Sequence, residues 1–448
     1  MQRYMVRERI KINVCSYKLY SNRPYLLALV MHAIYTICMS TSIRAHRIRL
    51  YPNNQQATYF RKACGVARKA YNWALDAWHT QYNAYKEDNS LPKPNQMALR
   101  KQLNAIKEAE YPWMLEVTKC APQMAIIQLG KAWDNFFKGR SKAPRFRKKG
   151  IDDRFTITND QFSVDATSIK IPKLGLVRMA EKLRFKGKLI EATVSRVADK
   201  WFVSIAVELE APILLKRTKN QGTVGIDLGI KSAVIPSKGA PIDSPKPLKN
   251  LLKRLQRLSR SLSRKQKGSQ NRKKACIKLA CLHERISNIR KDWLHKTTRY
   301  LASNFDTVVI ENLNVSGMMR NRRLSRAISD IGFYELRRQL EYKAPEYGTR
   351  ILVADRFFAS SKTCSCCGYK LDTLSLSTRE WTCPDCGTEH DRDFNAAKNL
   401  ENLAGRQPAS VCGEESSGRT VVRSVKLSST KQKVNLKSTN DQICVSFI

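Results

Sequence analysis

The spacing of apolar residues changes several times along the chain, and each change predicts a different kind of element. Residues 43–50 alternate apolar and basic side chains, as a strand with one basic face would. Apolar residues then recur at helical spacing over residues 56–85 and again over 95–137. Leu91-Pro92-Lys93-Pro94 separates the two helical regions. The first third of the chain is therefore predicted to be one strand followed by helices.

Three tryptophans in these helical regions are spaced as core residues rather than as base-stacking platforms: Trp73, Trp78 and Trp133. The second region leads into a basic run, residues 138–149, that contains Phe146. In single-strand nucleic-acid binding, Lys and Arg contact the phosphate backbone and an aromatic ring stacks on a base. A solvated linker would have the same composition. Arg145 and Arg147 are the candidate nucleic-acid contacts in this run.

The apolar pattern changes to period two between residues 154 and 209. Short apolar stretches there are bounded by Pro, Gly and Asp. The clearest strands are 168–171, 189–194 and 201–207. Several short strands in succession predict a small β-barrel or β-sandwich.

Buried-type strands alternate with helices in the second half of the chain, which predicts an α/β sheet. Two of these strands carry a carboxylate, Asp227 in the first and Glu311 near the end of the third. The expected elements are strands at 224–230, 232–236, 306–313 and 350–354 and a helix at 333–347.

A long basic helical region, residues 248–301, is inserted between these strands and broken at Gly268-Ser269. Leucines form an apolar stripe along its first part, so a helical hairpin is predicted. A merely solvated face usually mixes charges, whereas this one is almost entirely basic. We therefore expect it to face phosphates. Its candidate contacts are Arg254, Arg257, Lys265, Arg272 and Lys273.

Charge and length narrow the class of protein further. The chain has 448 residues, enough for two to four domains, with 81 Lys and Arg against 38 Asp and Glu. A net charge of +43 spread over the whole chain repels itself unless a polyanion is bound. Nucleic acid fits this surface better than an acidic membrane does.

The two ends of the chain differ in composition from the rest. Residues 25–39 are apolar but too short for a membrane span. We expect residues 1–40 to be an extension, with Met39 as the natural start. Residues 403–448 are rich in Ser, Thr and Gly and are expected to be disordered. The odd cysteine count of 13 indicates free thiols in a reducing cytosol.

Residues 360–390 contain two Cys-x-x-Cys pairs, each followed by Gly. Their spacing is typical of a structural, four-coordinate zinc ribbon. Buried thiols or disulfides are the alternative reading. Cys366 is an extra cysteine. If it replaced Cys367 as a ligand, only one residue instead of two would separate it from Cys364. The predicted ligands of one Zn²⁺ are Cys364, Cys367, Cys383 and Cys386.

Acidic residues follow the second cysteine pair, where Asp391 and Asp393 precede what looks like the first turn of a helix. Acids in this place are often helix caps. Together with Asp227 and Glu311, however, a third carboxylate could hold two divalent ions for phosphodiester hydrolysis. Oxygen ligands favour Mg²⁺ or Mn²⁺ over zinc.

These motifs together resemble the transposon-encoded TnpB (OrfB) family, relatives of the type V CRISPR nucleases, over about residues 42–402. The residues that carry the resemblance include Arg49-Leu50-Tyr51-Pro52-Asn53, Pro144-Arg145-Phe146, Gly225-Ile226-Asp227-Leu228-Gly229, Ile310-Glu311-Asn312-Leu313-Asn314 and Asp391-Arg392-Asp393-Phe394-Asn395. Departures from the pattern are the extension, Cys366 and Pro345.

The resemblance implies an RNase H-like (RuvC) nuclease domain with an inserted zinc ribbon and an N-terminal β-barrel split by a helical domain. It implies that Asp227, Glu311 and Asp393 are the RuvC acids, with Asp393 preferred over Asp391, and that Arg379 contacts a phosphate. The expected domains are residues 41–150, the first barrel strand and the helical domain; 151–220, the wedge-like barrel; and 221–402, the nuclease domain.

The activity implied by the resemblance is RNA-guided cleavage of double-stranded DNA, with a guide from the transposon end and the element's own transposase as a further partner. The implied location is the cytoplasm, at the nucleoid. A transposase with a His-hydrophobic-His pair and a Tyr nucleophile is disfavoured, because no two histidines are near each other in sequence. A metal-dependent strand transferase and a non-enzymatic zinc-ribbon regulator of transposition remain open.

Overall fold

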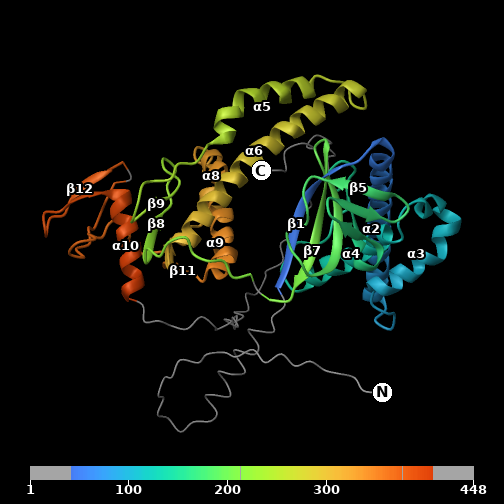
Figure 1. The fold of residues 1–448 in the computed structure, drawn as a ribbon, viewed down its shortest axis with the longest axis horizontal. Coiled ribbons are helices and arrows are strands. Elements are labelled where there is room, and N and C mark those ends of the chain that lie inside the picture. The colour runs from blue at the N-terminus through green and yellow to red at the C-terminus, as the bar shows by residue number, and fades with distance from the viewer. Residues whose placement is uncertain (1–41, 212, 376, 407–448) are drawn as a thin grey trace, which may run out of the picture.

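The computed structural model describes residues 42–211, 213–375 and 377–406 (Figure 1). The predicted extension at 1–40 lies outside these residues, as does the predicted tail from residue 407 onward. Residues 403–406, which were expected to begin that tail, are instead the last turn of a helix. In the described ranges no helix is both long and apolar enough to cross a membrane.

The first half of the described chain is built on a seven-stranded antiparallel sheet in the order β2-β6-β7-β1-β5-β4-β3. The alternating pattern of β1 buries Ile48 and Leu50 on the core face and leaves Arg47 and Arg49 exposed on the other side. The predicted closed barrel stays a prediction, since the pairing gives a sheet with β2 and β3 at its edges. The strands are β1 (Ser42–Tyr51), β2 (Arg154–Thr158), β3 (Ser163–Asp165), β4 (Ser168–Ile171), β5 (Gly175–Met179), β6 (Lys188–Val197) and β7 (Lys200–Leu209).

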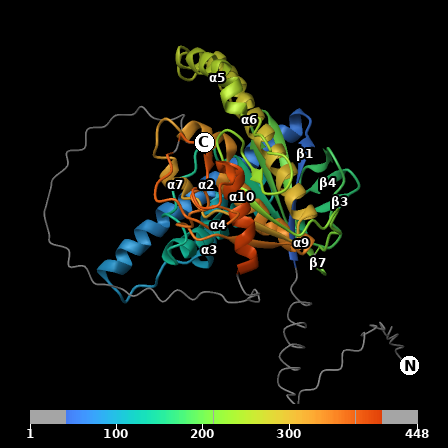
Figure 2. The ribbon, with the colours of Figure 1, turned by 90° about the vertical axis from the view of Figure 1, so that its left-hand side faces the viewer.

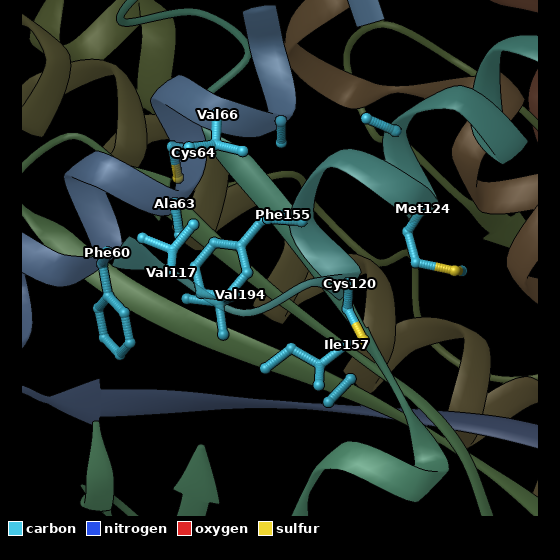
Figure 3. Close-up of a cluster of buried hydrophobic side chains, with 14 of the residues drawn as sticks. Phe60, Ala63, Cys64, Val66, Val117, Cys120, Met124, Phe155, Ile157 and Val194 are labelled. Carbon is cyan, nitrogen blue, oxygen red and sulfur yellow. The ribbon is translucent and has the colours of Figure 1, made fainter. Parts of the chain in front are cut away.

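Helices cover the core face of this sheet. They are α2 (Asn54–Glu87), α3 (Gln96–Glu110), the 3₁₀ turn η1 (Pro112–Glu116) and α4 (Cys120–Phe137), with a second 3₁₀ turn, η2 (Asn159–Gln161), after β2. Asn53 and Gln56 form a capping box that fixes the start of α2. Phe60 of α2 packs against Phe155 and Val194 of the sheet (Figure 3). The predicted core role is confirmed for Trp78 and Trp133, which stack at 5.6 Å and are each 7% exposed, whereas Trp73 is half-buried against the same core.

The second half contains a four-stranded sheet in the order β11-β10-β8-β9. Its strands are β8 (Thr223–Asp227), β9 (Ile235–Pro236), β10 (Thr307–Ile310) and β11 (Arg350–Val353). β8, β10 and β11 are parallel, and only β9 is antiparallel. The strands predicted at 224–230 and 232–236 are shorter than expected. A tight turn at Gly229, where a Cβ would lie 2.7 Å from the Ser232 carbonyl oxygen, takes up the residues between them.

Helices cover both faces of the second sheet. On one face, α6 (Gln270–Asn304) and α9 (Phe333–Tyr347) pack against Val308 and Ile310 of β10. On the other face, α10 (Arg392–Arg406) packs against Val309 of the same strand. Because side chains alternate along a strand, consecutive apolar residues of β10 serve both faces, which explains its continuous apolar run.

The predicted basic hairpin is present, formed by α5 (Pro247–Ser263) and the first part of α6. It projects from the molecule in both views (Figures 1 and 2). Leucines of α5 pack against Leu279, Leu282 and Ile286 of α6, so the apolar stripe is the seam and the basic residues face outward. Two short helices, α7 (Val315–Met318) and α8 (Ser325–Ile331), follow β10.

Two ion pairs join the halves of the molecule. Lys200 Nζ of β7 lies 3.1 Å from a Glu284 carboxylate oxygen of α6, and Arg44 of β1 lies 2.7 Å from Glu346 of α9. The first sheet therefore rests against the helices that cover the second. A two-stranded ribbon, β12 (Glu380–Thr382) and β13 (Glu389–Asp391), leads into α10.

Candidate active site and metal site

Asp227 and Glu311 lie next to each other at one edge of the second sheet. The parallel register pairs Ile226 of β8 with Ile310 of β10, and each acid is the next residue of its chain. Since the carboxyl ends of parallel strands meet at one edge, this register brings the two acids together without any long loop. The sequence placed both acids correctly at strand ends.

The helix α10 brings a third acid to the same edge. α10 packs on β8, and Asp393 is in its first turn. The close approach depends on Gly225, where a Cβ would lie 2.0 Å from the carbonyl oxygen of Ala397. Asp391 has a different role, since its Oδ1 accepts a hydrogen bond of 2.8 Å from the backbone N–H of Phe394 and so caps the helix.

The electric field at this edge disfavours ionised carboxylates. Burial, followed by the charges of Glu311 and Asp393, raises the pKa of Asp227 from 3.8 to about 8. Burial also raises the pKa of Glu311, and a hydrogen bond of 2.8 Å from Ser360 Oγ partly opposes that rise. Converging buried carboxylates of this kind are stabilised as anions by bound cations.

The donor set fits hard divalent ions. All three side chains offer carboxylate oxygens, the ligands that Mg²⁺ prefers. In the described part of the chain, only the four ribbon cysteines form a group whose ligand atoms all lie within 4.8 Å of one another. The three acids do not form such a group in the described residues.

Two further features surround the acids. Arg379 Nη1, from the ribbon, lies 3.4 Å from Asp393 Oδ2 and is well exposed. An open pocket of about 480 Å³ lies beside Glu311, lined by Tyr334 and Arg337 among others. Glu311 thus borders an open, partly basic pocket and Asp393 lies beside an exposed arginine, so a polyanionic substrate can approach both.

The four predicted zinc ligands come together. The Sγ atoms of Cys364 and Cys386 are 3.6 Å apart, as are those of Cys367 and Cys383. Sulfurs at the corners of a tetrahedron with Zn–S bonds of about 2.3 Å would be about 3.8 Å apart, so the cluster fits one zinc ion. None of the described cysteines forms a disulfide, and Cys366 is exposed and outside the cluster.

A histidine supports the cluster, and the sequence analysis missed it. His390 Nε2 lies 3.0 Å from Cys364 Sγ, and its ring packs 4.7 Å from that of Trp381. A ring N–H that donates to a metal-bound thiolate orients that ligand. Trp381 and His390 are directly opposite each other in the β12–β13 ladder. The alternation of side chains along these two short strands is the only sequence signal that could have indicated the role of His390.

Side-chain amides of α10 connect the ribbon to the acids. Asn395 accepts from the Ser365 N–H at 2.9 Å and donates to the Thr363 carbonyl at 2.8 Å. Asn399 donates to the Ser360 carbonyl at 2.8 Å. The segment that supplies Ser360 to Glu311 is thereby fixed to the helix that supplies Asp393. Sequence reasoning gave no role to Ser360 or Asn399, because no local pattern marks them.

The predicted nucleic-acid contacts fall into two groups. Some are already engaged within the protein: Arg147 lies 3.7 Å from the Tyr71 ring centroid, and Arg272 Nη1 bonds to the carbonyls of Leu262 and Lys265 across the hairpin turn. Lys265 is partly buried and Arg379 is beside Asp393, as above. The exposed members, which form no ion pair in the described residues, are Arg145, Arg254, Arg257 and Lys273.

Three family models match the chain. The model described as "Probable transposase" matches residues 204–322, "Cas12f1-like, TNB domain" matches 333–400, and "Helix-turn-helix domain" matches 39–87. The first two together span the carboxylates and the cysteine cluster.

Relatives with curated names align over most of their length. A Streptomyces pristinaespiralis protein named "Putative RNA-guided DNA endonuclease" is 39% identical over 384 residues, which cover 83% of this chain and 91% of the relative. An Escherichia coli protein with the same name, InsQ, is 32% identical and covers 83% of this chain and 94% of its own. The chain belongs to the TnpB (OrfB) family.

A solved structure shares the fold. The cryo-EM structure of a Cas12f1–sgRNA–target DNA complex matches with a TM-score of 0.51 and 14% identity, over 81% of this chain and 99% of that one. The mixed α/β, multidomain architecture is therefore similar to that of this Cas12f1 protein. At this identity the match concerns the fold alone.

Proposed function

We propose that this protein is an RNA-guided, metal-dependent DNA endonuclease encoded by a transposon. The names of its relatives support this activity. The observation that carries the proposal is the register of β8 and β10, which places Asp227 and Glu311 side by side under the first turn of α10, where Asp393 is. Three carboxylates on neighbouring elements of an α/β sheet are the arrangement of an RNase H-like (RuvC) centre.

In this proposal Asp227, Glu311 and Asp393 hold two Mg²⁺ or Mn²⁺ ions. When bound, such a pair stabilises the attacking and leaving oxygens of a phosphodiester. Ser360 holds the Glu311 carboxylate in position through its 2.8 Å hydrogen bond. Arg379 limits the repulsion at Asp393 and is exposed enough to contact a substrate phosphate. One Zn²⁺ in the ribbon has a structural role, because four thiolates leave no open coordination position.

The substrate proposed is double-stranded DNA, selected by a guide RNA from the transposon end. The net charge of +43 and the outward basic face of the α5–α6 hairpin support a polyanionic partner of this size. Arg254, Arg257 and Lys273 are the phosphate contacts in this proposal. The domain boundaries at 150 and 220, the closed wedge-like barrel, the transposase as a partner and a place at the nucleoid belong to the same proposal.

A plasmid-cleavage assay tests it. The protein would be co-expressed with its flanking transposon-end RNA, purified, and given Mg²⁺ and plasmids with a randomised sequence beside the target. Guide-dependent cuts that disappear in Asp227→Ala are the expected result. Tight RNA binding with no cleavage by either protein would contradict the proposal and favour a non-enzymatic regulator.

A further inference from the structure

A group of aromatic rings lies where the ends of α2 and α4 meet the basic run. We call the rings of Tyr82, Tyr85, Phe136, Phe137 and Phe146 the aromatic platform. Phe137 is 54% exposed and Phe146 is 50% exposed. Single exposed apolar side chains are common on proteins, but a contiguous group is not.

Four of these rings, those of Tyr82, Tyr85, Phe136 and Phe137, contact one another. The Phe137 ring centroid is 6.1 Å from that of Tyr82 and 5.4 Å from that of Phe136, and Tyr82 is 6.4 Å from Tyr85. Phe137 also stacks at 5.6 Å on Trp133, which in turn stacks on Trp78 in the core. The platform is thus the exposed end of a stack that begins in the protein interior, so its rings are held in fixed orientations.

The segment that carries Phe146 is also held in place. The Asn72 side chain accepts from the Arg147 N–H at 2.8 Å and donates to the Arg147 carbonyl at 3.0 Å. The Arg147 guanidinium packs on Tyr71 and donates to Gln128 at 2.9 Å. Arg147 therefore presents Phe146 rather than binding a ligand itself. His79 links Phe146 to Trp133 through ring contacts of 6.4 and 5.7 Å.

Positive charge surrounds the platform. Lys86 Nζ lies 4.9 Å from the Tyr82 ring centroid, and Lys93 Nζ lies 5.1 Å from that of Tyr85. Further exposed cations follow α4 directly. In the described residues none of the following forms an ion pair with a carboxylate: Lys86, Lys93, Lys138, Arg140, Lys142 and Arg145.

We propose that the aromatic platform is a stacking site for unpaired nucleobases, with the surrounding Lys and Arg on the phosphates. Fixed aromatic faces beside unpaired cations are the combination that single-strand binding surfaces use. A protein partner would have to cover an apolar patch surrounded by Lys and Arg that form no ion pairs in the described residues. A nucleic-acid strand fits this surface better, because it supplies both negative phosphates and flat bases. The site lies on α2 and α4, whereas the carboxylates lie on β8, β10 and α10, so this binding does not require cleavage at Asp227.

The test is binding of the full zinc-loaded chain, without Mg²⁺, to fluorescent oligo(dT) and oligo(U) and to a duplex of the same length. Phe137→Ala and Phe146→Ala should each weaken single-strand binding by about 5- to 100-fold and change duplex binding much less. Phe137→Trp should bind as the wild type does. An oligonucleotide with 2-aminopurine should lose fluorescence on binding the wild type and Asp227→Ala, but not Phe137→Ala.

Trp113→Ala is the matched control, because Trp113 is 42% exposed in the same helical region but is not part of the platform. It should leave binding unchanged. Circular dichroism and zinc content check that each variant is folded. A larger loss with oligo(dT) would assign the site to a DNA strand, and a larger loss with oligo(U) to the guide. Unchanged single-strand binding in both Phe→Ala variants, or an equal loss for duplex, would overturn the proposal.

Discussion

Gly225 lies directly under the backbone of α10, so close that a Cβ would be 2.0 Å from the carbonyl oxygen of Ala397 and 2.4 Å from the backbone nitrogen of Glu401. No side chain can be added there without moving the helix. Because Asp227 is two residues along the same strand and Asp393 is in the first turn of that helix, this contact sets the spacing of the proposed catalytic acids.

Gly225→Ala should therefore displace α10, lower the melting temperature and abolish cleavage. Gly405→Ala is the control in the same helix, since nothing lies within 4 Å of a Cβ at that position. Alanine is the better helix former, so Gly405→Ala should be neutral or stabilise by up to about 1 kcal/mol. Thermal unfolding and cleavage of both variants check the prediction. Equal behaviour of the two would show that the close contact does not position the acids.

The two aspartates before α10 should differ in their response to substitution. Asp393→Asn should reduce cleavage by more than about 100-fold, because it removes a proposed metal ligand rather than a supporting residue. Asp391→Ser keeps a side-chain oxygen for the Phe394 N–H and should retain most activity. Asp391→Ala should lose about 1 kcal/mol of stability instead. Retained cleavage in Asp393→Asn, with loss in Asp391→Ser, would reverse the assignment.

The contribution of Asp227 to the stability of the metal-free protein should fall as pH rises. The unfolded chain releases the Asp227 proton near pH 3.8, whereas the folded protein keeps it up to about pH 8. The folded state therefore binds more protons throughout this window, and the free energy of unfolding decreases with increasing pH. Asp227→Asn has no such proton to lose.

Without Mg²⁺ at pH 8, Asp227→Asn should melt at least about 2 °C above the wild type, and the difference should shrink toward pH 5. Mg²⁺ should raise the melting temperature of the wild type at pH 8 more than that of the variant. A difference that is independent of pH would mean that Asp227 ionises normally in the folded protein.

The extra cysteine provides a control for the zinc site. Cys383→Ser should lose zinc and, with it, the anchoring of Ser360 and Thr363 to α10, so cleavage should fall together with metal content. Cys366→Ser should keep one zinc per chain, because Cys366 is exposed and outside the cluster. Elemental analysis of both variants measures this. Zinc loss in Cys366→Ser would instead make Cys366 a ligand.

Sequence patterns predicted the features that are local in the chain. The α5–α6 hairpin, α9, the cysteine cluster and the strand-end positions of Asp227 and Glu311 each follow from spacing or periodicity over short stretches. The order of the seven strands in the first sheet did not follow, since β1 pairs with β7 across more than 150 residues of chain. Contacts at such separation leave no periodic signal.

The supporting residues of the site were missed for the same reason. Ser360 contacts Glu311 from 49 residues away, and Gly225 lies against Ala397 although the two are at opposite ends of the second half of the described chain. For Arg147 and Arg272, composition predicted a contact with nucleic acid although the side chains are already engaged. Both are basic residues in basic runs, but each has its guanidinium engaged by the protein itself, which composition alone does not reveal.

Guide reprogramming tests the central claim most directly. The wild-type protein and Glu311→Gln would be purified with each of two transposon-end RNAs that differ only in their guide segment, and each complex given Mg²⁺ and both matching plasmids. Cuts mapped by sequencing should follow the guide in the wild type and be absent in Glu311→Gln. Cuts that stay at one place when the guide changes, or that persist in Glu311→Gln, would contradict an RNA-guided nuclease centred on these carboxylates.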